Sequence, residues 1–101
     1  MQYEVLLIKA AQDDYNGFDG TIKKQAKVQL RKLTLSPELG RPLGKKMGLD
    51  LTEYRSLHFY GNKYRIVYKV DEGNRRVIVA GIGRRESAHI YDVVTRRVGR
   101  D

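Results

Sequence analysis

The chain has 101 residues, of which 41% are hydrophobic and 32% are charged. This length suits one domain with one hydrophobic core, so we expect a single domain over residues 1–101. No cysteine is present, which excludes disulfides, thiolate metal sites and cysteine nucleophiles. No apolar run approaches the roughly 18 residues that a membrane-spanning helix needs, and no basic segment precedes the first apolar run, so we expect no membrane partner and a cytoplasmic protein.

Two helices are predicted to follow a short strand at residues 2–8. The first helix runs over Lys9–Asp19, where apolar residues recur at helical spacing. Asp19 or Thr21 can cap the second helix, whose core-facing stripe consists of Ile22, Ala26, Leu30 and Leu33. That helix ends at Ser36-Pro37, because proline disfavours the helical conformation of the residue before it.

The rest of the chain reads as strands and turns with a final helix. Residues 37–50 hold both prolines and three glycines, which predicts a surface loop. Three strands are then expected over Leu51–Phe59, Lys63–Val70 and Arg75–Ile82, with Gly83 breaking the last, followed by a short helix over Glu86–Val98. We therefore predict an α+β fold in which two N-terminal helices pack on a mainly antiparallel, four-stranded sheet, with a short C-terminal helix.

Alternation along the third strand separates two groups of side chains. Tyr64, Ile66, Tyr68 and Val70 share one face, which we assign to the core. Arg65 and Lys69 point to the opposite face, which we expect to be left to solvent or a ligand. We expect Arg55 of the preceding strand to lie on that open face with them.

Hairpin geometry is expected to bring a set of cationic and proton-transferring residues together: Arg55, Arg65, Arg84, Arg85, His89 and Tyr91. Such a set suits a phosphodiester, because cleavage by the RNA's own 2′-hydroxyl needs a base, a proton donor and cations for the charged phosphorane. Arginine can stabilise the negative charge of the phosphorane, but its high pKa makes it a poor proton donor or base. Tyr91 can act as the base or pack on the sheet edge, and His89 can transfer a proton or lie on the surface.

The net charge of +8 makes a polyanion the first candidate partner. From Lys23 to Lys46 the chain has eight basic residues against one acid, Glu38. This tract is either a solvated surface or a phosphate-binding one, with Lys23, Lys27, Arg31, Lys45 and Lys46 as its RNA contacts together with Arg84. Four tyrosines, Tyr54, Tyr60, Tyr64 and Tyr68, can stack on bases, although alternation places Tyr64 and Tyr68 in the core. His58 has no visible chemical companion and is assigned to the hairpin surface. With two histidines and no acidic cluster near either, we expect no metal and no cofactor.

Three strings carry a resemblance to a known family: LTLSPELGRPLGKKMG (Leu33 to Gly48), YRIVYKV (Tyr64 to Val70) and GIGRRESAHIY (Gly81 to Tyr91). In this order, over most of the chain, they resemble the RelE/ParE superfamily of bacterial toxins from type II toxin–antitoxin pairs. The resemblance implies a small α+β fold neutralised by a cognate antitoxin. In the RelE branch it implies a toxin that enters the ribosome and cuts mRNA without metal. Such a toxin would also contact the phosphates of ribosomal RNA.

The same resemblance suggests roles for individual residues. Arg65 and Arg85 match phosphate-stabilising arginines, Tyr91 matches a proposed base, and Arg55 matches a basic residue of the second strand. The chain departs from the RelE pattern at Leu57, where a second lysine is expected. His58, His89, Lys45 or Lys46 can compensate for this loss.

Two other functions remain open at this point. The ParE branch shares the fold but resembles an inhibitor of DNA gyrase, lacks the nuclease residues and is not an enzyme. A catalytically degenerate module, whose basic surface serves only an acidic antitoxin or DNA, is the third. Arginine at both positions together with Tyr91 favours the endoribonuclease, an mRNA interferase that inhibits translation.

Overall fold

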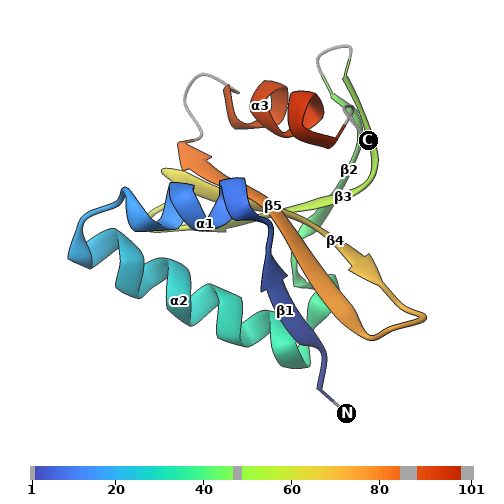
Figure 1. The fold of residues 1–101 in the computed structure, drawn as a ribbon, viewed down its shortest axis with the longest axis horizontal. Coiled ribbons are helices and arrows are strands. Elements are labelled where there is room, and N and C mark those ends of the chain that lie inside the picture. The colour runs from blue at the N-terminus through green and yellow to red at the C-terminus, as the bar shows by residue number, and fades with distance from the viewer. Residues whose placement is uncertain (1, 47–48, 85–88, 99–101) are drawn as a thin grey trace.

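A five-stranded mixed sheet with strand order β1-β5-β4-β3-β2 forms the centre of the fold (Figure 1). The computed structural model describes residues 2–46, 49–84 and 89–98. The strands are β1 (Glu4–Leu7), β2 (Arg41–Lys46), β3 (Leu49–Phe59), β4 (Tyr64–Asp71) and β5 (Arg76–Arg84). β1 runs parallel to β5, and the other neighbours are antiparallel. The predicted α+β class is confirmed, with one strand more than expected.

The helices begin and end close to the predicted positions. They are α1 (Lys9–Asn16), α2 (Gly20–Leu35), the 3₁₀ turn η1 (Pro37–Leu39) and α3 (His89–Val98). The side chain of Asp19 caps α2 by accepting a hydrogen bond from the Ile22 amide at 3.0 Å, as predicted. α2 ends at Leu35, directly before Ser36-Pro37. α1 is shorter than expected, since it stops at Asn16 and not at Asp19.

Glycine and proline residues led to two wrong predictions about the sheet. The expected loop over residues 37–50 contains η1 and the edge strand β2, which pairs with β3 through a bulge between Pro42 and Gly44. An edge strand tolerates proline, because its missing amide faces away from the ladder. Gly83 does not break β5, because it pairs with Arg65 inside the ladder and the strand continues to Arg84.

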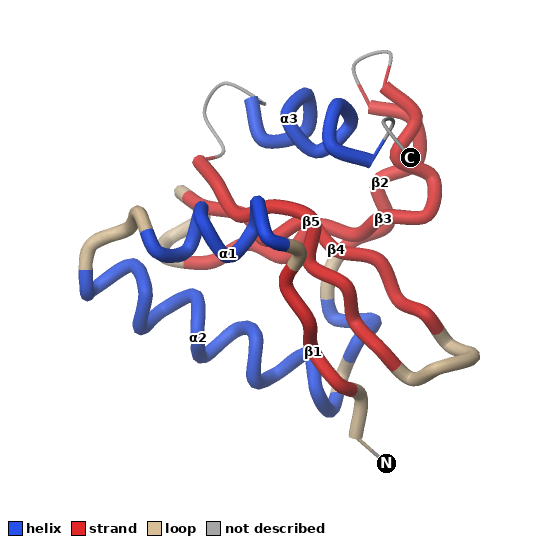
Figure 2. Tube along the Cα trace, viewed as in Figure 1, coloured by secondary structure: helices blue, strands red, loops and turns tan. Residues whose placement is uncertain are grey.

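Helices cover both faces of the sheet (Figure 2). α1 and α2 pack on the face that carries Ile66 and Tyr68, which confirms the predicted core face of β4. α3 packs its Ile90, Tyr91 and Val94 on the opposite face, in a second cluster with Tyr54 and Val67. The face expected to be open is therefore partly closed by α3.

Glycine brings α3 close to the sheet. A Cβ atom at Gly81 would lie 2.7 Å from Cγ2 of Val94 and 2.9 Å from Cδ1 of Ile90, too near for any real contact. The missing side chain lets the helix sit directly on β5. The same helix is held at its far end by Arg97.

Arg97 and Asp14 cover the part of the β5 edge that β1 leaves unpaired. β1 ends at Leu7, beyond which β5 has no neighbouring strand on that side. Asp14 of α1 accepts a hydrogen bond from the Ile82 amide at 3.0 Å, and Arg97 donates to the Ala80 carbonyl at 2.8 Å. The two side chains also form an ion pair at 2.9 Å, with 21% of each exposed. Side chains thus replace backbone partners here and join α1, β5 and α3.

Among the described residues, no helix is both long and apolar enough to span a bilayer.

Candidate functional site

The centre of the candidate site is the contact between Arg65 in β4 and Tyr91 in α3. The Nη1 of Arg65 donates a hydrogen bond to the Tyr91 hydroxyl, and the guanidinium carbon lies 5.5 Å from the centroid of that ring. Tyr91 is 2% exposed. The hydroxyl oxygens of Tyr91 and Ser56 are 3.3 Å apart, also within hydrogen-bonding distance. The predicted pairing of Arg65 with Tyr91 is therefore present in the structure.

Arg65 also carries an unmet hydrogen-bonding group. Its Nε is the one buried side-chain nitrogen or oxygen within residues 2–46, 49–84 and 89–98 that has no hydrogen-bond partner. Buried polar groups are nearly always paired, and a guanidinium loses much of its hydration when it is covered. An anion that reached this nitrogen would satisfy it.

His58 lies directly across the ladder from Arg65. The β3–β4 register pairs Phe59 with Tyr64 and His58 with Arg65, so the two side chains leave the sheet on the same face. Ser56, two residues earlier, shares this face. The assignment of His58 to a hairpin surface without a chemical companion is wrong. The four-residue connection between β3 and β4 was the signal that could have found it, because pairing the strand ends and counting back sets 58 against 65.

Arg55 lies on the other face of the sheet, contrary to the prediction. It pairs with Tyr68, whose side chain points toward α2. Its Nη1 donates to the carbonyls of Glu38 at 3.2 Å and Gly40 at 2.8 Å. Alternation correctly separated Arg55 from its neighbours in β3, but only the register decides which face of β3 meets Arg65. In this position Arg55 holds η1 against the sheet.

Other predicted catalytic residues are placed only in part. Arg85 lies outside the described residues, and His89 opens α3 but its side chain is not described. Arg84 ends β5 and is exposed, with its guanidinium carbon 5.7 Å from the centroid of Tyr64. It lies at the same end of the sheet as Arg65, because Tyr64 pairs with Arg84 and Arg65 pairs with Gly83.

The predicted basic tract does not converge on Arg65. Lys23, Lys27 and Arg31 belong to α2, on the opposite face of the sheet, and the Lys23 ammonium lies 6.0 Å from the Tyr15 ring centroid. Lys45 is exposed on the edge strand β2, and the side chain of Lys46 is not described. The cations of α2 therefore lie on the face of the sheet that does not carry Arg65.

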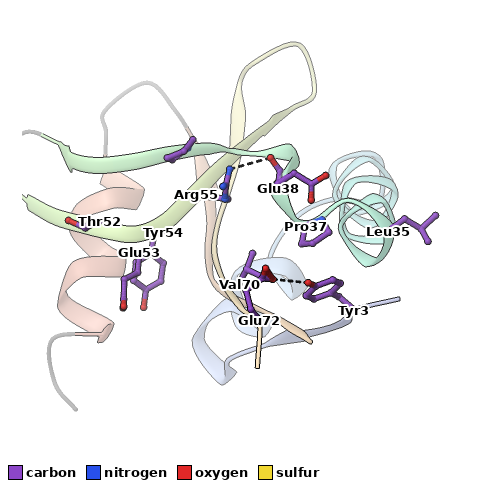
Figure 3. Close-up of a pocket in the computed structure, with 11 residues that line it drawn as sticks. Tyr3, Leu35, Pro37, Glu38, Thr52, Glu53, Tyr54, Arg55, Val70 and Glu72 are labelled. Carbon is purple, nitrogen blue, oxygen red and sulfur yellow. Dashed lines mark hydrogen bonds between the residues drawn. The ribbon is translucent and has the colours of Figure 1, made fainter. Parts of the chain in front are cut away.

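A groove of about 420 Å³ beside η1 is unsuited to RNA (Figure 3). Its rim carries the carboxylates of Glu38, Glu53 and Glu72, which repel phosphate. The Tyr3 hydroxyl donates to Glu72 at 2.7 Å, and this hydrogen bond raises the pKa of Tyr3. The groove contains Arg55 and lies apart from Arg65 and Tyr91.

A family model described as the ParE toxin of the parDE type II toxin–antitoxin system matches residues 5–89. The chain belongs to this family. The match includes Arg65 and most of the sheet, and it places the ParE-family chain in the RelE/ParE superfamily of toxin–antitoxin toxins that its sequence resembles. No curated protein matches the chain.

Solved structures of RelE and ParE toxins share the fold of this ParE-family chain. The free E. coli toxin RelE, solved as a double mutant, has 22% identity and a TM-score of 0.73, with 97% of this chain and 99% of that chain covered. The RelE–RelB complex from the archaeon Pyrococcus horikoshii has 17% identity and a TM-score of 0.65, covering 87% of this chain and 100% of that chain. A YoeB/ParE toxin from Agrobacterium tumefaciens has 18% identity and a TM-score of 0.64, covering 81% and 98%.

Proposed function

We propose that this chain is a ribosome-dependent endoribonuclease toxin that cuts mRNA through the face formed by Arg65, His58 and Tyr91. One observation carries the proposal: a half-buried arginine whose Nε–H is covered and has no partner, hydrogen-bonded through Nη1 to a tyrosine and paired across the ladder with a histidine. A phosphate oxygen is the ligand that a guanidinium fork fits best.

The reaction is a transfer of the scissile phosphate to the neighbouring 2′-oxygen. The 2′-hydroxyl gives up its proton and attacks phosphorus, the bond to the 5′-oxygen breaks, and that oxygen takes a proton. The products are a 2′,3′-cyclic phosphate and a 5′-hydroxyl. Arg65 stabilises the charge that builds on the phosphorane oxygens, which is the largest single contribution in reactions of this kind.

Two side chains are available for the proton transfers. The Tyr91 oxygen accepts a hydrogen bond from Arg65, which places it beside the proposed phosphate ligand, and we assign it the role of base. His58 is assigned to protonate the leaving oxygen, because imidazole changes charge near neutral pH. Arg85 and His89 remain predicted participants, the first as a second phosphate ligand.

Arg65 must shift its guanidinium to receive a phosphate on both nitrogens, because Nη1 is hydrogen-bonded to Tyr91 and Nε is buried in this structure. That change costs little on the side of Nε, which has no hydrogen bond to lose. The Tyr91 hydroxyl keeps Ser56 as a neighbour when Arg65 leaves. Substrate binding therefore exchanges one hydrogen bond to a hydroxyl for hydrogen bonds to an anionic phosphate, which are stronger.

A cognate antitoxin is the second partner of the proposal. Complexes of RelE with the antitoxin RelB are among the structures with this fold. A net charge of +8 suits an acidic antitoxin as well as ribosomal RNA. Antitoxin binding should hence survive substitutions that abolish cleavage.

A gyrase inhibitor is the alternative, and the description of the matching family model as ParE favours it. Such a toxin acts by protein contact, so it needs neither the Arg65 guanidinium as a phosphate ligand nor Tyr91 as a base. It would leave mRNA intact and block supercoiling.

The test is growth after induction of the chain from a tightly repressed promoter. Arg65→Ala should abolish growth arrest, with a loss of cleavage of roughly 100-fold or more. Lys69→Ala is the matched control, since Lys69 is a cation on the same face of the same strand, over the Tyr54 ring. Full growth arrest by folded Arg65→Ala protein would overturn the proposal. Inhibition of supercoiling by the purified protein would instead support the gyrase inhibitor.

A further inference from the structure

The tip of the β3–β4 hairpin carries an aromatic cluster that the proposed chemistry does not use. The Tyr60 and Tyr64 rings meet edge to face with centroids 6.0 Å apart. Phe59 and Phe18 contact the same Tyr64 ring at 5.5 Å and 5.4 Å. The inner rings anchor the cluster to the core, while Tyr60 is 40% exposed.

Tyr60 has an unfavourable backbone conformation. Its φ is +53°, and Gly61 and Asn62 follow with +61° and +71°, so the chain turns through three left-handed residues. Glycine and asparagine accept this conformation readily, but a bulky side chain is disfavoured in it. Burial does not offset the cost here, because the ring remains substantially exposed. Strain at an exposed aromatic residue is a reason to look for a ligand.

Cations flank the exposed rings. The Lys63 ammonium lies 5.9 Å from the Tyr60 ring centroid, and the Arg84 guanidinium lies 5.7 Å from that of Tyr64. The sequence holds no acidic residue from Tyr54 to Val70. An exposed aromatic ring beside cations suits an unpaired nucleobase and its phosphate.

The cluster adjoins the candidate site. The Phe59–Tyr64 pair follows the His58–Arg65 pair in the ladder, one residue nearer the tip. Successive side chains of a strand point to opposite faces, so the Tyr64 ring lies on the face that α1 and α2 cover, while Arg65 lies on the other. An RNA strand on Arg65 would hence pass around the end of the hairpin to stack a base on Tyr60.

We propose that the hairpin tip, residues 60–63 with Arg84, is a stacking site for one unpaired nucleobase of an RNA strand, with Tyr60 as the stacking ring and Lys63 and Arg84 as phosphate contacts. The proposal rests on the proposed function for the identity of the strand as RNA. It requires binding but no cleavage, so the two can fail separately.

The test uses the absence of tryptophan from the chain. Tyr60→Trp, made in the full chain with Arg65→Ala to prevent toxicity, gives a single tryptophan at the tip, which is excited at a wavelength that the tyrosines do not absorb. A short 2′-O-methyl oligoadenylate, which lacks a reactive 2′-hydroxyl, should quench it by stacking. An RNA duplex of the same length should not quench the tryptophan fluorescence, and neither should heparin. Leu35→Trp, at an exposed position at the end of α2, is the matched control and should not respond.

Affinity for the same oligonucleotide provides the second readout. Tyr60→Ala should weaken binding roughly 5- to 100-fold, as expected when one stacked base is lost, and Tyr60→Phe should restore it. Unchanged affinity of Tyr60→Ala, or equal quenching by heparin, would overturn the proposal. Stacking without mRNA cleavage by the wild-type chain would keep this site and refute the nuclease.

Discussion

Replacing Tyr68 by phenylalanine should destabilise the fold more than any other loss of one hydroxyl group in its sheet. Tyr68 is fully buried. Its hydroxyl donates to the Pro37 carbonyl at 2.7 Å and accepts from the Gly40 amide at 2.8 Å. Gly40 is packed tightly here, because a Cβ atom would lie 2.9 Å from the Ser56 carbonyl oxygen. Tyr68→Phe therefore leaves a donor and an acceptor unpaired next to η1.

The expected loss of unfolding free energy follows from these two bonds. The bond to Pro37 is worth about 1 kcal/mol, and leaving the buried Gly40 amide unpaired costs about 1–3 kcal/mol, so we expect a loss of about 2–4 kcal/mol. For a chain of this size that lowers the melting temperature by roughly 10–20 °C. The assay is urea and thermal unfolding followed by circular dichroism, with Arg65→Ala in every variant to allow expression.

Tyr64→Phe is the matched control for Tyr68→Phe. Tyr64 lies on the same face of β4, and its hydroxyl makes no hydrogen bond to the described residues. The control should stay within about 0.5 kcal/mol of its parent. Equal stability of the two variants would refute the assignment of a structural role to the Tyr68 hydroxyl.

The same hydroxyl predicts a pH dependence. Burial raises the pKa of Tyr68 above its ordinary value. A raised pKa means that the folded state favours the neutral phenol. The stabilisation that this gives is complete below the pKa of the unfolded chain, about 10, and is lost as the pH rises beyond it. The fall in stability above that pH should be smaller in Tyr68→Phe. Parallel curves for the two proteins would contradict this.

Two further predictions concern charged groups. Arg97→Ala removes the ion pair with Asp14, so it should lower the unfolding free energy by about 1–2 kcal/mol and speed amide exchange in α3, whereas the exposed Arg96→Ala should do neither. Protection of α3 that is equal in both variants would refute the link. Hydrogen bonds from the side chain and amide of Asn74 lower the pKa of Asp71. The lowered pKa stabilises the folded state at pH values above the ordinary pKa of the carboxyl, and this stabilisation is lost as the pH falls through the folded value. An NMR titration should show a higher pKa in Asn74→Ala, and an unchanged midpoint would contradict the assignment.

Local rules predicted the elements whose signals lie within a few residues. The Asp19 cap, the stop before Pro37 and the alternation of Tyr64 with Arg65 all appear in the structure as expected. Strand β2 was missed because Pro42 and Gly44 normally mark loops, and only the partner strand β3 shows them to be a bulged edge.

Placement across the sheet was less predictable. Arg55 was set on the wrong face because alternation separates two faces without saying which one meets a neighbouring strand. His58 shows the converse, since the length of the hairpin connection contained the register that pairs it with Arg65. The bond between Arg97 and Asp14 joins residues 83 positions apart, and no local pattern announces it.

The sequence predicted which two residues meet at the candidate site, but not that Tyr91 is buried there. Arg65 and Tyr91 were expected together from the hairpin and the final helix, and they form a hydrogen bond. The burial of Tyr91 depends on how α3 settles on Gly81, a contact between distant elements.

The most direct test of the nuclease is a map of mRNA 5′ ends soon after induction. The wild-type chain and Lys69→Ala should create new ends inside translated codons, and Arg65→Ala should create none. Intact messages in growth-arrested cells, or cuts that persist with Arg65→Ala, would contradict the assignment of Arg65 as the phosphate ligand of an RNA-cleaving toxin.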